Sequence, residues 1–362
     1  MNHKAFRYRI YPNRDQEILL RKTFGCTRFV WNRMLSDRNE GKPAQYPAYY
    51  KKEFEWLREV DSLALCNTQL QLNRAFADFH KGEKEHPKFK AKHLARKSYT
   101  TNVVNGNIEL TDKSIRLPKL GKIRARVHRH APENWRMKSV TVTEEATGKY
   151  YASVLYEYES QVAEHTDVEK SIGLDYAADG LYVDSDGNSA QMPKYLKKAQ
   201  FRLKKKQRKL SKKRAMGKEI QSNRYYKLKK QIASLHEKVR HQRQDFLHKR
   251  SRELVNAYDY IGIEDLDMKE MAGTHGKSTA ENGWGLFTGM LTYKAQEEGK
   301  HVIKVGRYFP SSQMCHACGT PNPSLRDLGI RGWICPVCGV WHDRDHNAAI
   351  NLKQEAIRIS IQ

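Results

Sequence analysis

The sequence predicts an α+β protein of two or three domains, because its hydrophobic period changes several times along 362 residues. Residues 4–11 alternate between apolar and polar side chains and predict a strand. Asn13, with Gln16 three residues later, resembles a helix cap, and a helical module is expected to follow as far as a loop at residues 82–90. From Thr100 the period returns to two, which predicts a small antiparallel barrel or sheet that includes the first strand.

A second sheet is expected in the C-terminal half. Its strands are predicted to begin at Lys170, with residues 180–183 as the partner strand, and to continue at residues 258–264 and 302–305. A helix at about residues 286–298 separates the last two strands. A long basic connection is expected to interrupt this sheet.

The positive charge of the chain is concentrated in that connection. Overall, 66 Lys and Arg face 41 Asp and Glu, and the formal net charge of +25 favours nucleic acid as a partner over a membrane surface. Residues 194–252 hold 23 of these Lys and Arg and three acids, and so account for +20 of the +25. Apolar residues repeat at helical spacing from Leu228 to Phe246, so a long helix is expected, with Gly217 at the turn of a helical hairpin.

Cysteine usage and hydropathy indicate the compartment. The first residues lack the apolar core of a signal peptide, and no run approaches the roughly 18 apolar residues that span a bilayer. We therefore expect a cytoplasmic, nucleoid-associated protein without membrane contact. Four of the six Cys form two Cys-x-x-Cys pairs, while Cys26 and Cys66 stand alone. In a reducing compartment this pattern indicates metal binding rather than disulfides.

Three acids stand out as candidate catalytic residues. Asp175 and Glu264 each end a predicted strand, and each has a glycine two residues earlier on the same face, which suggests room for an ion. Asp345 stands two residues before Asn-Ala-Ala, at the start of a helix whose small residues permit close packing on a sheet. Three such acids can hold two Mg²⁺ ions, typically about 3.5–4 Å apart, at a phosphodiester, and Mn²⁺ should substitute.

Any one of these acids alone would more simply be a strand-end or cap carboxylate, and only the set favours catalysis. Four neighbouring acids are expected to have other roles. Asp179 and Asp343 fit turns and caps, and Asp265 has the wrong strand parity; Asp267 is the fourth.

The two cysteine pairs have the spacing of a zinc ribbon. Cys315 and Cys318 are separated by sixteen residues from Cys335 and Cys338, and each pair is followed by a glycine for a tight turn. Four thiolates leave no open coordination position, so a structural Zn²⁺ is expected. His316 and His342 are nearby alternatives as ligands, although contact with solvent or nucleic acid is the simpler interpretation for both.

Nucleic-acid contacts are expected at basic and aromatic positions in two regions, the helical module and the basic segment. Core packing is the simpler explanation for Phe76 and Phe79 of the module. The candidates are Tyr46, Tyr50, Asn67, Lys204, Lys205, Lys206, Arg208, Lys209 and Arg243.

Several motifs together resemble the TnpB (OrfB) family of insertion-sequence endonucleases, which is related to type V CRISPR effectors, and the resemblance runs essentially end to end. The motifs read FRYRIYPN at residues 6–13, PKFK at 87–90, LPKLG at 117–121, RQDFLHK at 243–249, YFPSSQMCHAC at 308–318 and HDRDHNAAINL at 342–352.

The resemblance implies a domain order. A wedge-like β domain would comprise residues 1–13 and 99–167, with a helical recognition domain at 14–98 inserted in it. A RuvC-type, RNase H-like α/β nuclease domain would comprise residues 168–308 and 340–362. It would contain a basic helical insertion at 194–256 and a zinc ribbon at 309–339 that binds the target nucleic acid.

The resemblance also implies an activity. Family members bind a guide RNA made from the transposon end, read a short motif beside the target, open the duplex and cut both strands. Residue by residue, the family's three acids fall on Asp175, Glu264 and Asp345. Where the family commonly has glycine two residues after the first acid, this chain has Ala177.

Three other interpretations remain open. A catalytically silent relative would use guide RNA to bind DNA and block transcription, although an intact set of acids counts against it. A CRISPR-associated effector would share the same fold. A transposase proper would need a nucleophilic Tyr, and none of the 19 Tyr has a paired-His motif close by. One protein per RNA is the expected assembly.

Overall fold

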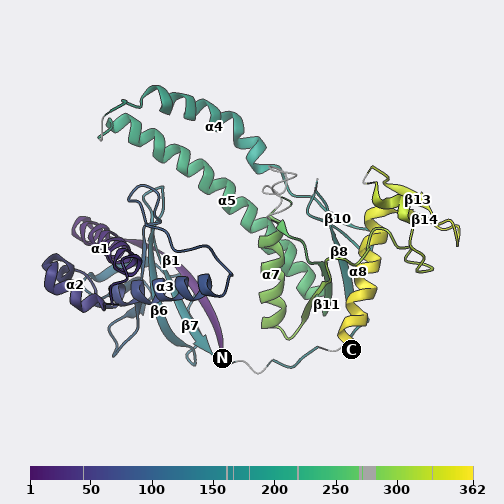
Figure 1. The fold of residues 1–362 in the computed structure, drawn as a ribbon, viewed down its shortest axis with the longest axis horizontal. Coiled ribbons are helices and arrows are strands. Elements are labelled where there is room, and N and C mark those ends of the chain that lie inside the picture. The colour runs from purple at the N-terminus through teal and green to yellow at the C-terminus, as the bar shows by residue number, and fades with distance from the viewer. Residues whose placement is uncertain are drawn as a thin grey trace. The chain divides into compact units, whose positions relative to one another are not determined.

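The computed structural model describes residues 1–43, 45–159, 162–165, 167–178, 180–217, 220–268, 271, 283–327 and 329–361. Within them the chain forms two compact units, Met1–Ser160 and Gln161–Gln362, each with its own main sheet (Figure 1). None of the helices in these residues combines the length and the apolar character that crossing a membrane requires.

The first unit is built on seven antiparallel strands. They are β1 (Asn2–Tyr11), β2 (Ser98–Asn102), β3 (Glu109–Thr111), β4 (Ser114–Leu117), β5 (Gly121–Arg126), β6 (Arg136–Glu144) and β7 (Tyr150–Tyr158). The order is β2-β6-β7-β1-β5-β4-β3, so β1 pairs with strands from more than a hundred residues later, which confirms that the first strand joins this sheet. Because β2 and β3 are edges that do not pair with each other, the described strands form an open sheet and not a closed barrel.

The helical module follows β1 as expected and comprises α1 (Arg14–Asn39), α2 (Pro47–Glu53), the 3₁₀ turn η1 (Glu55–Glu59) and α3 (Ser62–His80). The predicted cap is confirmed. The backbone N–H of Gln16 donates to Asn13 Oδ1 at 2.9 Å, and that of Asn13 donates to Gln16 Oε1 at 3.0 Å. Leu20 and Phe24 of α1 belong to the core over the sheet, whereas Met34, near the end of the same helix, packs in a second core with α3.

The second unit contains the mixed sheet that the sequence predicts. Its strands are β8 (Ser171–Tyr176), β9 (Tyr182–Asp184), β10 (Ser189–Ala190), β11 (Tyr260–Glu264) and β12 (His301–Val305). The order is β10-β9-β8-β11-β12. β8, β11 and β12 run parallel, while β9 is antiparallel to β8.

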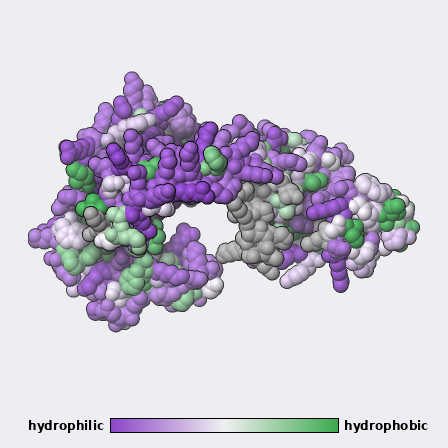
Figure 2. Space-filling model, turned by 90° about the horizontal axis from the view of Figure 1, so that it is seen from above, coloured by the Kyte–Doolittle hydropathy of each residue, from purple (hydrophilic) through white to green (hydrophobic). Residues whose placement is uncertain are grey.

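A basic helical hairpin joins β10 to β11. It consists of α4 (Tyr195–Lys212) and α5 (Asn223–Ala257), and the turn between them contains Gly217, as expected. Lys206 Nζ donates to Gln231 Oε1 at 2.6 Å and so ties the two helices together. The space-filling view is dominated by hydrophilic side chains, with hydrophobic residues in small separate patches (Figure 2).

Helices cover both faces of the second sheet (Figure 1). On one face, α5 and α7 (Trp284–Glu297) pack on the apolar side chains of β8 and β11, including Ile172 and Ile263. On the other face lies α8 (Arg344–Ile361), which contacts both β8 and β11. A cysteine-containing ribbon with η2 (Pro323–Arg326), β13 (Gly332–Ile334) and β14 (Trp341–Asp343) precedes α8.

Two glycines allow α8 to lie against the backbone of the sheet. A Cβ atom on Gly173 of β8 would stand 2.0 Å from the carbonyl oxygen of Ala349, and one on Gly262 of β11 would stand 2.6 Å from that of Leu352. The sequence predicted that small helix residues pack on the sheet, and this is confirmed. The expectation that the glycines leave room for an ion is wrong, because the helix backbone occupies that space.

Substituting Gly173 with Ala is expected to lower the free energy of unfolding of the second unit by about 2–3 kcal/mol, because the added methyl group must displace the α8 backbone. Gly289→Ala on α7 is the matched control. A Cβ there meets nothing within 4 Å, so alanine should be neutral or stabilise the helix by about 0.5–1 kcal/mol. Thermal unfolding of both variants checks this, and equal melting temperatures would contradict the close packing.

Candidate functional site

The three predicted acids meet at one edge of the second sheet. The parallel register pairs Gly173 with Gly262, so that Asp175 and Glu264, two residues further along each strand, end neighbouring strands at the same edge. Asp175 is 9% exposed. Asp345 lies in the first turn of α8, which packs on the same two strands. The close approach of α8 to the glycines therefore brings the third acid to the first two.

The electrostatics of these acids favour a bound cation. Burial, and after it the charges of Glu264 and Asp345, raises the pKa of Asp175 well above its usual range. Burial likewise raises the pKa of Glu264, against the lowering effect of a hydrogen bond from Ser311. A divalent cation would relieve this repulsion and compensate the lost hydration. A donor set of carboxylate oxygens thus fits a hard cation such as Mg²⁺.

Arg331 and Ser311 are site residues that the sequence analysis missed. Arg331 donates from Nη1 to both carboxylate oxygens of Asp345, at 3.3 and 3.4 Å. The Ser311 hydroxyl donates to Glu264 Oε1 at 2.5 Å. Both residues lie in irregular segments of the ribbon, where no periodicity or spacing points toward a distant partner, so no signal in a single sequence could have identified them.

The neighbouring acids have other partners. Lys304 Nζ donates to Asp265 Oδ1 at 3.1 Å. This fits the prediction that Asp265, one residue after Glu264, points to the other side of the strand. The backbone N–H of His346 donates to Asp343 Oδ1 at 3.0 Å, which caps α8 and confirms the cap predicted for Asp343. Asp267 lies in the loop after β11. Asp179 is outside the described residues.

The four predicted cysteines form one cluster, with all four sulfur atoms within 4.8 Å of one another. The Sγ atoms of Cys315 and Cys338 are 3.6 Å apart, as are those of Cys318 and Cys335, far longer than the roughly 2.05 Å of a disulfide. Among the described His, Cys, Asp and Glu residues, these four are the group of three or more whose ligand atoms, as they lie in the structure, could hold a metal ion. Its donor chemistry fits a soft or borderline ion such as Zn²⁺.

The two halves of the cluster have the same backbone turn. Gly319 N donates to the Cys315 carbonyl at 2.8 Å, and Gly339 N donates to the Cys335 carbonyl at 2.9 Å. Both glycines have φ of +73°, which favours glycine over any other residue. The role in a tight turn that the sequence predicted for these glycines is therefore confirmed.

His342 is a partner of the cysteine cluster rather than a surface residue. It is 3% exposed, and its Nε2 lies 3.1 Å from Cys315 Sγ. Burial lowers the pKa of this histidine, which keeps the imidazole neutral. The expected contact of His342 with solvent or nucleic acid is thus wrong. A neutral ring N–H at this distance can donate to a thiolate and orient a metal ligand.

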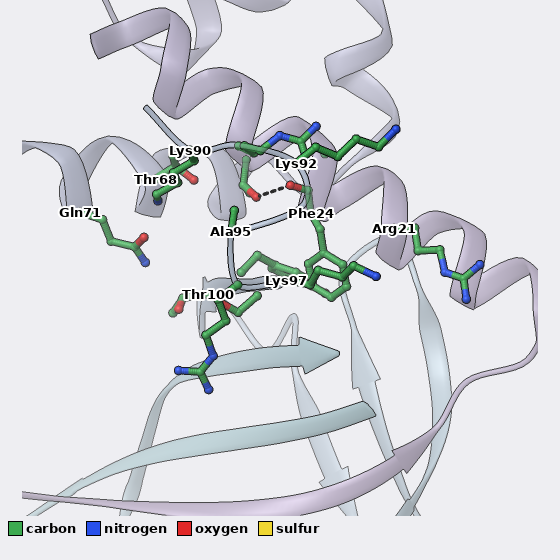
Figure 3. Close-up of a pocket in the computed structure, with 15 residues that line it drawn as sticks. Arg21, Phe24, Thr68, Gln71, Lys90, Lys92, Ala95, Lys97 and Thr100 are labelled. Carbon is green, nitrogen blue, oxygen red and sulfur yellow. Dashed lines mark hydrogen bonds between the residues drawn. The ribbon is translucent and has the colours of Figure 1, made fainter. Parts of the chain in front are cut away.

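A basic pocket of about 370 Å³ opens in the first unit between α1, α3 and the segment that leads into β2 (Figure 3). Its lining includes six cations and no acid. Lys90 Nζ lies 3.4 Å from the centre of the Trp31 ring, and burial lowers the pKa of Lys90 to about 8. Phe24 and Tyr99 contribute apolar surface. The cations are Arg21, Arg28, Lys90, Lys92, Arg96 and Lys97.

The sequence analysis did not identify this pocket, because four of its six cations come from the irregular segment 90–97. Of the contacts predicted in the helical module, Tyr46 is 71% exposed. The prediction for Tyr50 is wrong, because the side chain is 1% exposed and its hydroxyl donates to Asp37 Oδ2 at 2.6 Å inside the core. Asn67 donates from Nδ2 to the Leu63 carbonyl of its own helix.

The contacts predicted in the hairpin have mixed surroundings. Lys206 is partly buried and engages Gln231, and Arg243 is partly buried on α5 beside Gly283. Four candidates are exposed on α4, namely Lys204, Lys205, Arg208 and Lys209. The hairpin therefore presents a dense row of cations that is suited to a phosphate backbone.

Three protein-family models match the chain. Residues 153–275 match the IS605 OrfB model, described as a probable transposase, and residues 284–352 match the TNB domain of Cas12f1-like proteins. Residues 1–41 match a model described as a helix-turn-helix domain. In the structure those residues form the strand β1 and the single helix α1.

Relatives match over nearly the whole chain. A protein of Streptomyces pristinaespiralis named as an RNA-guided DNA endonuclease is 32% identical, over 96% of this chain and 88% of its own length. InsQ of Escherichia coli K12, named in the same way, is 29% identical, over 96% and 91%. Among solved structures, Cas12f1 in a complex with sgRNA and target DNA has a TM-score of 0.60 at 11% identity, covering 97% of this chain and 98% of that one.

Exchange of Cys318 for Ser should release metal from the cluster, because three thiolates and a hydroxyl bind zinc far more weakly than four thiolates. Elemental analysis of the purified chain should find about one zinc per wild-type molecule and far less in the variant. Cys66→Ser, which removes an exposed cysteine remote from the cluster in sequence, is the control. Full zinc in the Cys318 variant would contradict the ligand set.

Proposed function

Because the chain belongs to the TnpB (OrfB) family of transposon-encoded proteins, we propose that it is an RNA-guided endonuclease that hydrolyses double-stranded DNA. Two full-length relatives carry that name, at 32% and 29% identity. The observation that best supports the proposal is the meeting of Asp175, Glu264 and Asp345 at one sheet edge, where burial and mutual repulsion raise the pKa of Asp175. Mutually repelling buried acids are typical of metal-dependent catalytic sites.

The order of the second sheet supports an RNase H-like, RuvC-type nuclease domain. In such a domain three parallel strands and one antiparallel neighbour carry acids at one edge, and a helix from the end of the domain supplies another. Here β8 and β11 end in Asp175 and Glu264, and α8 begins beside Asp345. The hairpin and the ribbon then correspond to insertions between elements of this domain.

We assign Asp175, Glu264 and Asp345 as the ligands of two Mg²⁺ ions, for which Mn²⁺ could substitute. Bound there, the ions would supply an activated water and charge stabilisation at the scissile phosphate. The chain's own residues would orient the reaction. Ser311 holds the Glu264 carboxylate, and Arg331, which neutralises Asp345, is long enough to turn toward a phosphate oxygen once cations replace it.

The cysteine cluster is proposed as a structural Zn²⁺ site. Four thiolates fill the coordination sphere and leave no position for substrate. His342 would donate a hydrogen bond to Cys315, which reduces the negative charge that four thiolates place on one ion. The ribbon would then be a small domain stabilised chiefly by its metal, since its own hydrophobic core is small.

Nucleic acid is proposed to contact both units. The exposed cations of α4 suit the backbone of a guide RNA or of its heteroduplex with the target, whose sequence would be read by base pairing. The pocket in the first unit suits the phosphates of the duplex beside the target, because six cations and no acid line it. We expect one protein for each guide RNA derived from the transposon end.

A silent, RNA-guided repressor is the second candidate, since it would keep every binding surface and lack only the chemistry. An intact set of acids disfavours it, because a chain without catalysis has no need to hold three mutually repelling carboxylates together. A CRISPR-associated effector would use the same protein with a different RNA.

Asp175→Ala should abolish DNA cutting, because the substitution removes one of the three carboxylates that would hold the proposed ions. The measurement is cleavage of a target plasmid by protein co-expressed with its flanking transposon-end RNA, in Mg²⁺ or in EDTA. Asp265→Ala, which removes an acid paired with Lys304, is the matched control and should cut like the wild type.

Cutting that needs the RNA, the target and Mg²⁺, and that Asp175→Ala loses, supports the guided nuclease. Tight RNA-dependent binding of the target without any cutting by the wild type would favour the repressor. Cutting by Asp175→Ala at the wild-type rate would refute the assignment of the acids.

The charge of Lys90 should make target binding depend on pH. Because its pKa is lowered to about 8, Lys90 is largely charged at pH 7 and largely neutral at pH 9, so a phosphate contact there weakens as pH rises. We expect the affinity of the RNA complex for target duplex to fall by about fivefold over this range. In Lys90→Arg, which stays charged, the fall should be smaller.

Binding is best measured in the Asp175→Ala background, which keeps the target intact. Lys92→Arg, which exchanges an exposed cation of the same pocket, is the control and should keep the pH dependence of the wild type. Equal pH dependence in the wild type and in Lys90→Arg would show that Lys90 does not contact the duplex.

A further inference from the structure

The segment between β12 and the first cysteine connects the two candidate metal sites. It follows Val305, the last residue of β12, and leads into Cys315 of the cysteine cluster. Within it, the side chain of Ser311 reaches Glu264. Both Ser311 and Cys315 are buried, at 4% and 0% exposure. Short turns and a single bridge between Met314 and Pro321 pair part of the segment's backbone. The carbonyls of Ser311 and Met314 accept instead from side chains elsewhere in the chain.

Two asparagines of α8 hold this segment. Asn347 and Asn351 are one helical turn apart and therefore point from the same face of the helix. Asn351 Nδ2 donates to the carbonyls of Ser311 and Met314, both at 2.7 Å. Asn347 Nδ2 donates to the Met314 carbonyl at 2.8 Å, and its Oδ1 accepts from the backbone N–H of His316 at 3.0 Å.

These contacts lie on both sides of Cys315, since Met314 precedes it and His316 follows it. Each asparagine is 1% exposed, so water does not compete for the bonds. Any displacement of Cys315 must therefore strain the asparagine contacts, and through Asn351 it must also displace the backbone of Ser311.

Ser311 in turn defines the orientation of Glu264. An ionised carboxylate can only accept, so the serine hydroxyl is the donor of the 2.5 Å bond to Oε1. This bond restricts rotation of the carboxylate about its last torsion, which is otherwise soft. A metal that needs Glu264 in one orientation then binds without first ordering it.

We propose that Ser311 is a positioning residue for Glu264, and that Asn347 and Asn351 couple it to the cysteine cluster, so that zinc in the cluster strengthens divalent-metal binding at the acids. The proposal rests on the assignment of the acids as metal ligands in the proposed function. It concerns metal affinity, which can be measured without guide RNA or DNA.

The first test is a titration of the zinc-loaded full chain with Mn²⁺, in which the electron paramagnetic resonance signal measures the concentration of free Mn²⁺. Ser311→Ala is expected to weaken Mn²⁺ binding by about tenfold while zinc stays at one per chain. Ser312→Ala is the matched control, because the Ser312 hydroxyl contacts only Arg344 at 3.5 Å among its described partners. It should bind Mn²⁺ like the wild type.

Ser311→Thr keeps the hydroxyl and should stay within about twofold of the wild type. If Ser311→Ala does not fold, Ser311→Thr still tests the positioning role. Unchanged Mn²⁺ affinity in zinc-loaded Ser311→Ala would overturn the positioning role. So would a folded Ser311→Thr that binds Mn²⁺ as weakly as Glu264→Ala.

The second test addresses the coupling. Cys318→Ser, which loses zinc, should bind Mn²⁺ about fivefold more weakly at the acids. Adding Cys318→Ser to Ser311→Ala should lower the Mn²⁺ affinity little further than Ser311→Ala alone, because both changes release the Glu264 carboxylate. The double variant Cys318→Ser, Asp175→Ala measures any Mn²⁺ bound away from the acids, and this amount is subtracted. Wild-type affinity without zinc, or full additivity of the two changes, would overturn the coupling.

Failure of the proposed function has a different signature. If Asp175→Ala alone left Mn²⁺ binding intact, the acids would not be the metal site, whatever Ser311 did. If Asp175→Ala abolished binding and Ser311→Ala had no effect, the metal site would stand and only the positioning role would fall.

Discussion

The contact between α8 and the sheet backbone is the constraint on which the candidate site depends. A helix can approach two strands this closely only where both lack a Cβ, and Gly173 and Gly262 meet that need at paired positions of the parallel register. The same alternation that places the glycines under α8 places Asp175 and Glu264 on the face that α8 covers. Because Asp345 lies in the first turn of that helix, the depth of packing decides whether the third acid reaches the first two. A larger side chain at either glycine would separate the acids as well as weaken the core.

The repulsion among the three carboxylates explains why hydrogen-bond donors and arginines surround them. Burial and mutual repulsion raise the pKa of Asp175, whereas Arg331 and Arg344 act in the opposite direction. Arg331 pairs with Asp345 on its partly exposed side, and Ser311 supplies a donor to Glu264 on the buried side. Arg331 thus acts on both Asp175 and Asp345, while Ser311 acts on Glu264. Such partial compensation keeps the acids together in the protein while leaving unmet negative charge that a divalent cation can satisfy.

Local signals in the sequence were sufficient for most elements, and long-range contacts account for the differences. The capping box at Asn13, four of the five strands of the second sheet, the hairpin turn near Gly217 and the cysteine turns all depend on residues a few positions apart, and all were predicted. The two-residue strand β10 was not predicted. The glycines before Asp175 and Glu264 were read as space for an ion, because nothing local reveals that a helix nearly two hundred residues from Gly173 fills that space. Tyr50 and His342 were assigned to the surface from residue type alone, whereas their buried side chains contact Asp37 and Cys315, 13 and 27 residues away. The basic pocket was missed for the same reason, since its cations converge from α1 and from a segment without periodicity.

The position of the ribbon in the chain gives it a role beyond its own fold. It leaves the sheet after β12, contacts Glu264 of the sheet through Ser311, and ends in β14, which continues directly into α8. Its first end contacts Glu264 through Ser311, and its last end becomes the helix turn that carries Asp345. The cysteine cluster lies between these ends, with His342 of β14 against Cys315 of the opposite half. A metal that closes the cluster therefore fixes the distance between the two segments that orient two of the three acids. A metal bound at the cysteines would then influence one bound at the proposed acid site without sharing a ligand, because Asn347 and Asn351 bond the backbone on both sides of Cys315 and at Ser311.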